Sequence, residues 1–434
     1  MSRRPYLALQ HRDFRWLWAS MLVSLTGTQM QVVAINWHVY LLTRSALALG
    51  FVGLTRVVPV IVFSMWGGVL ADRADRRRVM FAAQSAMTGV SLLLAWLAFA
   101  RRDSVAALYL LNAVQAAATA FDNPARQALV PRLVPVADLA GALALNLTMF
   151  HLAMIAGPAL AGLLIAGGSA APAAATLGAG ARAATSALGL IYALNAASFL
   201  SVLAAVATMR TSGRVGAGDA HRESPREALR AGLRFVFTTP LMVWTMGLDF
   251  IATFFSGAMS LLPIVADQVL RVGAAGYGWL AASPAAGALL GSLYTSLRPL
   301  PRRQGRVLLW AVAAYGLATI LYGLSRSYAL TFLALAGTGL ADVVSTVIRQ
   351  TLRQLITPDE LRGRMTAVNM VFFLGGPQLG EMEAGLLASL FASASLGVTV
   401  SIVSGGLVTL LATALVAAAA PVLRGYVGDP RPGA

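Results

Sequence analysis

The sequence predicts an all-α membrane protein with twelve transmembrane helices in two parallel six-helix halves. Three observations support this fold class. The chain of 434 residues is 58% hydrophobic and only 12% charged, whereas soluble domains carry about 25% charged residues. Its arginines gather at alternate ends of successive apolar runs, and part of the N-terminal half recurs 223 positions further along the chain.

Twelve apolar runs are long enough to cross the hydrocarbon layer of a bilayer, which is roughly 30 Å thick and takes about 20 helical residues. The basic N-terminus leads into a run that is longer than the core of a signal peptide, so we expect a retained first helix. The run at 105–121 is the shortest and can extend to Ala125. The expected spans are 16–42, 47–70, 79–100, 105–121, 139–166, 186–209, 241–266, 274–297, 307–324, 328–348, 365–391 and 396–420.

The distribution of arginine predicts the orientation. All 33 cationic side chains are arginine, and the net charge is +16. On one side of the membrane lie 26 arginines, on the other lie six, and Arg56 falls within a span. Because short cytoplasmic loops are enriched in basic residues, both termini and the central loop are expected in the cytoplasm. The basic charge is thus a topology signal rather than a sign of nucleic-acid binding. An arginine-rich, alanine-rich chain indicates a bacterium, so we expect a multi-pass protein of the bacterial inner membrane.

An internal repeat at an offset of 223 residues relates the two halves. It predicts an N-terminal six-helix bundle at 1–209, a cytoplasmic linker at 210–240 and a C-terminal six-helix bundle at 241–434. Parallel repeats of this kind occur in transporters, with the substrate site between them near the middle of the membrane. The matched pairs are Arg126-Gln127 with Arg349-Gln350, Pro135 with Pro358, Asn146 with Asn369, AGLL at 161–164 with AGLL at 384–387, and Gly50, Gly53 and Gly68 with Gly273, Gly276 and Gly291.

The linker contains a predicted amphipathic helix. The sequence SPRE at 224–227 is a capping box with proline at the first helical position. Arg226, Arg230 and Arg234 then follow at helical spacing, with apolar residues on another face. We expect this helix to lie on the cytoplasmic surface of the membrane and to brace the two halves. A regulatory or lipid-sensing role is the alternative.

The loop between spans two and three reads GGVLADRADRRRVM at 67–80. It resembles the signature loop of the major facilitator superfamily, although Asp75 stands where a glycine is usual. Two further stretches, FDNPARQALVP at 121–131 and LGGPQLGEMEAG at 374–385, resemble the bacterial efflux branch that includes the enterobactin exporters. The resemblance covers essentially the whole chain.

The resemblance implies a gating cluster on the cytoplasmic side. Asp72 and Arg76 are expected to join Asp122 at the end of span four and to hold that side shut. Breaking such a cluster would free one half to move against the other. An ordinary positively charged cytoplasmic loop without a gating role is the alternative. The residues assigned to the cluster are Gly68, Asp72, Arg73, Arg76, Arg77 and Asp122.

The stretch GPALAGLL in span five resembles the antiporter motif of the same superfamily. Gly157, Pro158 and Gly162 match the motif, whose proline bends the span and whose glycines allow close helix packing. In the family this motif marks exporters. Ordinary packing of small residues explains the same pattern without any role in transport.

Five charged residues fall within the expected spans, where a charge costs roughly 2.5–3.5 kcal/mol and indicates function. They are Arg56, Asp249, Asp342, Glu381 and Glu383. The two glutamates lie about 200° apart around a helix, so they face different sides. The family's arrangement brings spans two and eleven together, which implies that Arg56 pairs with one glutamate. The other would face the cavity and accept a proton or a cationic group. A static buried ion pair is the alternative.

The remaining intramembrane acids are Asp249, a second candidate for protonation, and Asp342. Asp342 precedes Arg349 by seven residues, or two helical turns, which predicts a structural charge cluster. His38 and His151 can relay protons, although lone histidines more often serve packing. Gln31 and its polar neighbours in span one suit either a substrate lining or interhelical hydrogen bonds.

The sequence therefore predicts a secondary active transporter that exports drug-like or siderophore-like small molecules by proton-coupled alternating access. Its expected partners are a small-molecule substrate, protons and the lipid bilayer, and we expect a monomer. The chain lacks an ATP-binding loop, cysteine and metalloprotease motifs, which argues against an enzyme, a cofactor and a metal. Another cargo, such as a lysolipid or a sugar, and a non-transporting membrane sensor are the alternatives.

Overall fold

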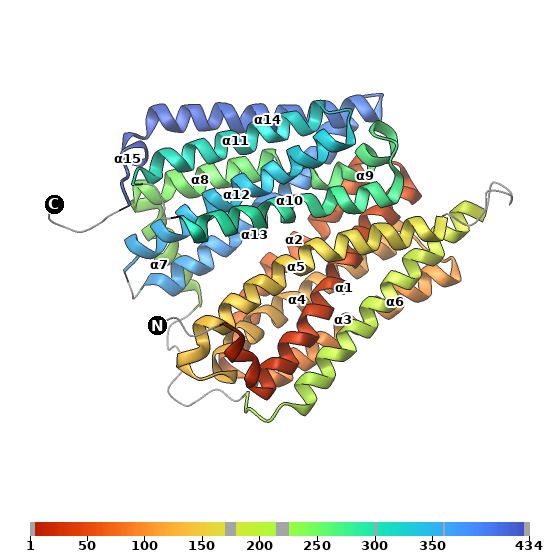
Figure 1. Cartoon of the computed structure of the whole chain (residues 1–434), viewed down its shortest axis with the longest axis horizontal. Helices are drawn as coiled ribbons and strands as arrows, with labels where there is room; N and C mark the ends of the chain where they lie inside the picture. Colours follow the sequence, from red (N-terminus) through yellow and green to blue (C-terminus); the bar gives the residue numbers. More distant parts are fainter. Residues whose placement is uncertain (1–4, 170–178, 214–224, 299–301, 359–360, 429–434) are drawn as a thin grey trace. The chain divides into compact units, whose positions relative to one another are not determined.

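The computed structural model describes residues 5–169, 179–213, 225–298, 302–358 and 361–428, and every regular element in them is helical (Figure 1). The first half contains η1 (Pro5–Gln10), α1 (Arg12–Thr43), α2 (Ala46–Arg73), α3 (Arg76–Ala100), α4 (Val105–Leu133), α5 (Val136–Ser169) and α6 (Ala179–Thr208). The second half contains α7 (Pro225–Thr238), α8 (Pro240–Phe255), η2 (Ala258–Leu261), α9 (Leu262–Ile264), η3 (Val265–Val269), α10 (Gly273–Leu297), α11 (Gln304–Leu324), α12 (Tyr328–Ile356), α13 (Arg362–Ser389), α14 (Ala394–Ala419) and α15 (Pro421–Arg424).

The helices match the expected spans. Within the described residues, nine helical stretches are long and apolar enough to cross a membrane. They coincide with expected spans two to seven, nine, ten and twelve. The other three spans correspond to α1, α10 and α13, which are also long helices but carry more polar or small residues. The predicted all-α fold of twelve helices in two halves is confirmed.

Two spans extend beyond their predicted ends. The fourth was expected to end at 121 or Ala125, but α4 continues to Leu133 despite Pro124 and Pro131. The tenth was expected to end at 348, but α12 continues to Ile356. An apolar run marks only the part of a helix that lies in the hydrocarbon layer. Both helices continue beyond that run with polar residues, whose side chains interact with other groups of the protein. The repeat offset is exact here, because α12 begins and ends 223 positions after α4 begins and ends.

The seventh span is broken, although the sequence predicts one continuous helix over 241–266. Helix α8 ends at Phe255, and a 3-10 turn, a short α-helical segment and a π-helical turn follow it. The carbonyls of Phe254 and Phe255 lie directly against the backbones of Gly380 and Gly405. Any side chain at either glycine would collide with these carbonyls, so the glycines of α13 and α14 accommodate the broken helix.

The chain forms two compact units. Unit 1 consists of Met1–Arg44, Thr55–Arg222 and Gly273–Ala282, and unit 2 consists of Ser45–Leu54, Glu223–Val272 and Ser283–Ala434. Each unit thus includes the first part of one helix, α2 or α10, from the other half of the sequence. The sequence boundaries at 209 and 240 stay a prediction.

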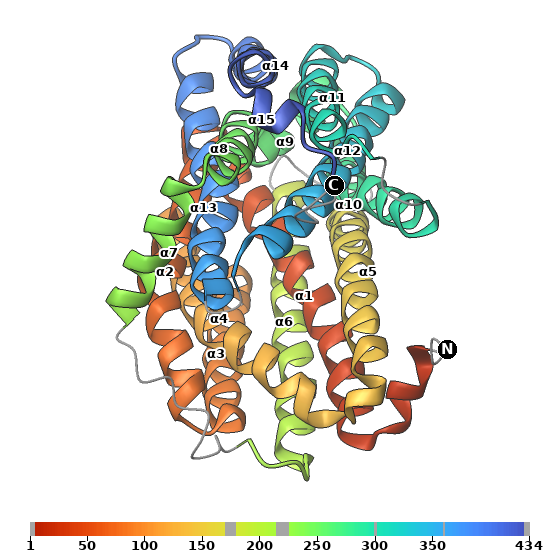
Figure 2. The same ribbon diagram turned by 90° about the vertical axis from the view of Figure 1, so that its left-hand side faces the viewer.

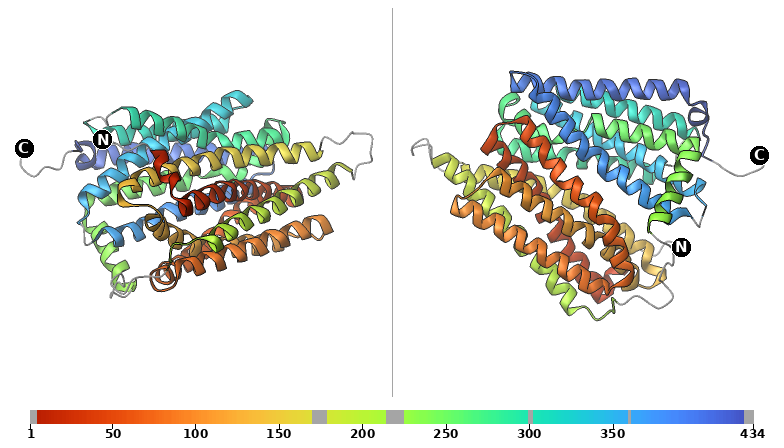
Figure 3. Two further views of the ribbon diagram at one scale, coloured as in Figure 1. Left: turned by 60° about the horizontal axis from the view of Figure 1, so that its bottom comes forward. Right: turned by 180° about the vertical axis from the view of Figure 1, so that it is seen from behind.

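The same helix pairs pack together in both units. In unit 1, α3 packs against α4 and α6, and α1 packs against α5 and α6; Figure 3 shows α3 in orange beside α6 in yellow-green. In unit 2, α11 packs against α12 and α14, and α8 packs against α13 and α14. These pairs correspond one to one across the repeat, so the two halves fold alike.

The predicted linker helix is present as α7, which runs along α13 within unit 2 (Figure 2). Val236 on its inner face is buried, while Phe237 is 66% exposed. Arg230 and Arg234 are also exposed. The side chain of Arg226, which belongs to the same expected basic face, lies outside the described residues.

The outward faces of the long helices are apolar, as a bilayer requires. On α3, the exposed side chains include Leu92, Leu93, Trp96 and Phe99. In each unit the buried cores contain Phe, Leu, Met and Val side chains from several helices. A surface of this kind is stable in lipid and not in water.

Candidate functional site

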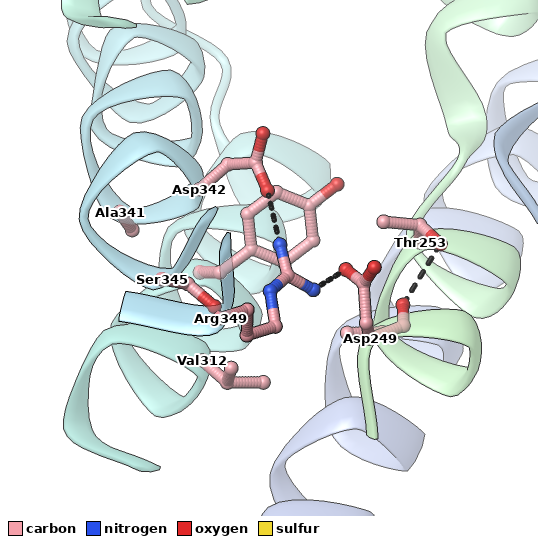
Figure 4. Close-up of a pocket in the computed structure, with 9 residues that line it drawn as sticks. Asp249, Thr253, Val312, Ala341, Asp342, Ser345 and Arg349 are labelled. Atoms are coloured by element: carbon pink, nitrogen blue, oxygen red, sulfur yellow. Dashed lines mark hydrogen bonds and ion pairs between the residues drawn. The ribbon is translucent and has the colours of Figure 1, made fainter. Parts of the chain in front are cut away.

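Arg349 of α12 lies between two carboxylates in unit 2, those of Asp249 and Asp342 (Figure 4). One guanidinium nitrogen, Nη1, is paired with Asp249 of α8. The other, Nη2, lies 3.5 Å from Asp342 Oδ1 and donates to Thr346 Oγ1 at 2.8 Å. The cluster therefore joins α8 to α12 through a single arginine.

Local helix geometry explains the arrangement. Asp342, Ser345 and Arg349 recur at intervals of three and four residues, so they lie on one face of α12. Asp249 lies nine residues after the start of α8, which places it about 13 Å along that helix. Thr253, one turn further, donates to the Asp249 carbonyl at 2.8 Å. Each carboxylate is thus presented from regular helix.

The cluster differs in exposure from one member to the next. The side chain of Arg349 is 6% exposed, that of Asp249 is 16% exposed and that of Asp342 is 44% exposed. A small pocket beside them, with a free volume of about 10 Å³, is lined by Val312, Tyr315 and Ser345 as well as the charged groups. This is about the space of one water molecule. Asp342 is thus the most exposed of the three charged groups.

The cluster places two carboxylates on one guanidinium, and the buried Arg353, one turn further along α12, acts on Arg349 as a second positive charge. Uptake of a single proton by either carboxylate would remove one of the two negative charges while leaving Arg349 paired with the other. Two carboxylates that share one cation act as a single coupled proton acceptor. The geometry can therefore bind and release one proton.

The sequence identified part of this site. The charge cluster of Asp342 and Arg349 was predicted from their spacing, and the structure brings them together. The pairing of Asp249 with Arg349 was not predicted, because the two residues lie 100 positions apart on different helices. No periodicity in a single sequence could have indicated that contact.

The predicted gating residues divide into two sets. The side chains of Gly68, Asp72 and Arg73 lie outside the described residues. Asp122 lies within α4 and not at its end; it accepts from Gln84 Nε2 at 2.9 Å and lies 3.5 Å from Arg126 Nε. Arg76, which is buried, donates to the Ala128 carbonyl at 3.2 Å. The gating role of the cluster stays a prediction.

Asp75, which stands where the family usually has a glycine, has a structural role at the start of α3. It is the N-cap of α3, and its Oδ1 accepts from the Arg77 amide at 2.9 Å. A carboxylate at this position satisfies a free amide and favours the positive end of the helix. Asp75 adopts an ordinary extended conformation with φ −63°. The turn therefore does not need a glycine.

The chain that follows α6 is fastened to the ends of α1 and α3. Asp13 Oδ2 accepts from the amides of Arg210 and Thr211 at 2.9 and 2.8 Å, and from Thr211 Oγ1 at 2.7 Å. Arg77 donates to the Val206 carbonyl at 2.8 Å. The start of the linker is thus held on unit 1.

Glu381 lies against α2 within unit 2. A Cβ built on Gly53 would lie 2.7 Å from Glu381 Oε2 and 2.9 Å from its Cβ. Glu383 is half-buried on another side of α13. Arg56 belongs to unit 1 and both glutamates to unit 2, and the pairing of Arg56 with a glutamate stays a prediction.

The glycines of the motif in α5 make close helix contacts in unit 1. A Cβ on Gly157 would lie 2.8 Å from the Thr26 carbonyl of α1, and one on Gly162 would lie 2.7 Å from the Ala274 carbonyl of α10. The carbonyl of Pro158 lies 2.5 Å from the Cβ position of Gly278. These contacts agree with the packing interpretation of the motif, whatever its role in export.

The polar residues of α1 are used in packing. Gln31 Oε1 accepts from Ser91 Oγ and from Asn195 Nδ2, each at 2.8 Å, which ties α1 to α3 and α6. Gln31 is 2% exposed. Of the two interpretations of Gln31, the structure therefore favours interhelical hydrogen bonding. In the part of the chain that the structure describes, no three His, Cys, Asp or Glu residues are placed to hold a metal ion.

Two similar six-helix halves with ionic groups within their spans are typical of membrane transporters. The comparison with known proteins agrees. The chain belongs to the transmembrane secretion effector family of major facilitator transporters, whose pattern matches residues 4–425.

Curated relatives of the chain include enterobactin exporters. The enterobactin exporter EntS of Shigella boydii is 28% identical over 391 residues, covering 89% of this chain and 88% of that protein. The EntS protein of an Escherichia coli strain is 27% identical over the same length and with the same coverage.

Solved structures of other transporters share the fold. A bacterial homolog of the human lysosomal transporter Spinster, inward-facing and unoccupied, matches with a TM-score of 0.72 at 17% identity, over 98% of this chain and 99% of that one. An inward-facing bacterial homologue of the iron transporter ferroportin matches with a TM-score of 0.68 at 14% identity, over 93% and 98% of the two chains. At such low identity the likeness shows the fold alone.

Proposed function

We propose that this protein exports a siderophore-like or drug-like small molecule from the bacterial cytoplasm by proton-coupled alternating access. The observation that carries the proposal is the cluster of Asp249, Arg349 and Asp342 in unit 2. The enterobactin exporters among the relatives support a siderophore-like cargo. The arginine distribution supports an inner-membrane location with both termini in the cytoplasm.

The cluster couples proton binding to movement through its charge. With both carboxylates ionised, Arg349 interacts with Asp249 of α8 and with Asp342 of its own helix, α12. When Asp342 takes up a proton, its attraction for Arg349 weakens and the arginine stays with Asp249. The ion pair between α8 and α12 therefore depends on the protonation state of Asp342. A proton gradient can drive a cycle of this kind, because the states differ in proton affinity.

Gradient-driven uptake into inverted membrane vesicles tests the proposal. The vesicle interior is made acidic, and uptake of a catecholate siderophore and of a panel of cationic dyes is followed. Exchange of the same compounds without a gradient is measured in parallel. Wild type should show both activities. Asp342→Asn removes the proton site while keeping the Arg349–Asp249 pair, so it should retain exchange and lose the dependence on the gradient.

Controls separate coupling from folding. Asp267→Asn removes a carboxylate of the same half that is not part of the cluster, and it should behave as wild type. Glu381→Gln and Glu383→Gln are compared in the same assay, because both remain candidates for proton binding. Gradient-driven uptake by Asp342→Asn at the wild-type rate would contradict the role of the cluster. Transport of lipids or sugars alone would replace the proposed cargo, and no flux of any compound would favour a sensor.

A further inference from the structure

Three side chains from three different segments meet inside unit 1. His38 of α1 places Nδ1 3.1 Å from the Tyr192 hydroxyl of α6 and Nε2 3.3 Å from Asp103 Oδ2. Asp103 belongs to the short loop between α3 and α4. His38 is 2% exposed and Tyr192 is fully buried, and the side chain of Asp103 is 11% exposed. The site is therefore nearly closed to solvent.

Two polar atoms of this group lack a hydrogen-bond partner in the described part of the chain, namely His38 Nε2 and Asp103 Oδ1. The Nε2 to Oδ2 distance fits an ion pair, although the two groups are not aligned for a hydrogen bond. Buried polar atoms without a partner are uncommon and call for an explanation. Protonation of the imidazole explains this pair, because a positively charged His38 would provide the buried Asp103 carboxylate with a partner.

The charged surroundings of His38 are simple. Among the described residues, Asp103 is the one charged group that acts on it electrostatically. Arg44, the C-cap residue that follows α1, is instead turned to Tyr40, whose hydroxyl accepts from Arg44 Nη1 at 2.8 Å. Arg101 and Arg102 precede Asp103 in the loop and are exposed. The described parts of α4 and α5, which also pack against α1, add no charge to this contact.

The imidazole can exist in two states here. When neutral, it accepts a hydrogen bond from the Tyr192 hydroxyl at Nδ1 and turns Nε2–H toward Asp103. When protonated, it donates from both nitrogens, and Nε2–H faces a carboxylate of opposite charge. One proton thus converts a weak polar contact into an ion pair that joins α1 to the loop.

We infer that His38 and Asp103 form a proton-binding site that fastens α1, near its C-terminal end, to the loop at 101–104. The site is distinct from the cluster around Arg349 and does not depend on transport being driven by protons. The arginine distribution predicts that this loop lies outside the cell. The site would accordingly respond to the external pH, tightening this end of unit 1 in acid.

Nuclear magnetic resonance of the full chain with ¹⁵N-labelled histidine, in detergent micelles, tests the inference. The chain has four histidines, so the His38 signals can be identified by their loss in His38→Gln. His38 should change between neutral and protonated forms as the pH falls. In Asp103→Asn the ratio of protonated to neutral His38 at a given pH should fall roughly tenfold or more, because an opposite charge at this distance has been removed.

Two other histidines provide matched controls in the same samples. His151 should be unaffected by Asp103→Asn. Asp138→Asn, which removes the carboxylate 2.9 Å from His11 Nε2, should leave the His38 signals unchanged. If Asp103→Asn does not fold, Asp103→Ser takes its place. A His38 that never becomes protonated, or whose protonated fraction is the same with and without the Asp103 carboxylate, would overturn the inference.

Discussion

Gly385 contacts Gly50 in unit 2 in the same way that Gly162 contacts Gly278 in unit 1. A Cβ on Gly385 would lie 2.6 Å from the Ala46 carbonyl and 2.8 Å from Gly50 Cα; a Cβ on Gly162 would lie 2.7 Å from both the Ala274 carbonyl and Gly278 Cα. Gly162 and Gly385 are 223 positions apart, as the repeat predicts. Their partners are 228 positions apart, so the predicted match of Gly50 with Gly273 is in the wrong register.

Alanine at either of these glycines should weaken the protein. The added methyl would meet backbone atoms that cannot move independently, so we expect Gly162→Ala and Gly385→Ala each to cost about 1–3 kcal/mol. The free energy of unfolding in detergent is the measurement. Gly247→Ala is the control, because a Cβ there meets nothing within 4 Å and alanine favours a helix. Equal stability of all three variants would contradict the close packing.

Removal of Arg349 should destabilise unit 2 strongly. Arg349→Gln leaves two carboxylates without their shared cation, which we expect to cost about 3–5 kcal/mol. The double variant Asp249→Asn with Arg349→Gln removes one of these charges and should recover part of the loss. Chemical unfolding of wild type, Arg349→Gln, Asp249→Asn and the double variant gives the coupling energy. No recovery in the double variant would mean that Asp249 and Arg349 are not energetically coupled.

Asp13 should stabilise unit 1 at neutral pH. Burial raises the pKa of Asp13, but hydrogen bonds from Thr211 and Arg210 outweigh it and hold the pKa below its ordinary value of 3.8. The contribution is therefore present above pH 3.8 and is lost as the pH falls through the lower value of the folded state. We expect Asp13→Asn to cost about 1 kcal/mol, since the site is partly exposed. The difference from wild type should persist at mildly acidic pH and vanish in strong acid.

The N-cap role of Asp75 predicts how substitutions at this position change the stability of α3. Asp75→Ala should cost about 1 kcal/mol, because the amide of Arg77 loses its acceptor. Asp75→Gly, which restores the usual residue of the family, should cost only a few tenths of that, since glycine also suits an N-cap. Hydrogen exchange of the first turn of α3 reports the difference. A larger loss with glycine than with alanine would mean that the flexibility of glycine outweighs its suitability as an N-cap, and would contradict the expected order.

Much of the fold could be predicted from the sequence because membrane helices can be recognised by their length and hydropathy. The ends of α1, α3 and α14 fall within a few residues of prediction. The break in the seventh span could not be predicted, because it depends on glycines of α13 and α14 that lie more than a hundred residues away. The polar extension of α4 was underestimated because its partner Gln84 is on another helix.

The candidate site was predicted in its residue types and only partly in its contacts. Charges inside apolar runs are conspicuous, so Asp249, Asp342, Glu381 and Glu383 could be named at once. The role of Arg349 as the shared partner of two acids could not be predicted, because that role depends on the packing of α8 against α12. His38 shows the same difficulty, since its partners Asp103 and Tyr192 come from a loop and from α6.

The sequence alone determined the class of protein, the number of spans, the repeat and the expected orientation, because each of these follows from local composition or from a regular offset. The tertiary structure decided which ionic groups are neighbours. An arginine can pair with any carboxylate within reach of its side chain, and only the packing of α8 on α12 selects Asp249. Likewise, only the meeting of α1, α6 and the loop before α4 turns His38 from an isolated histidine into the partner of a buried carboxylate.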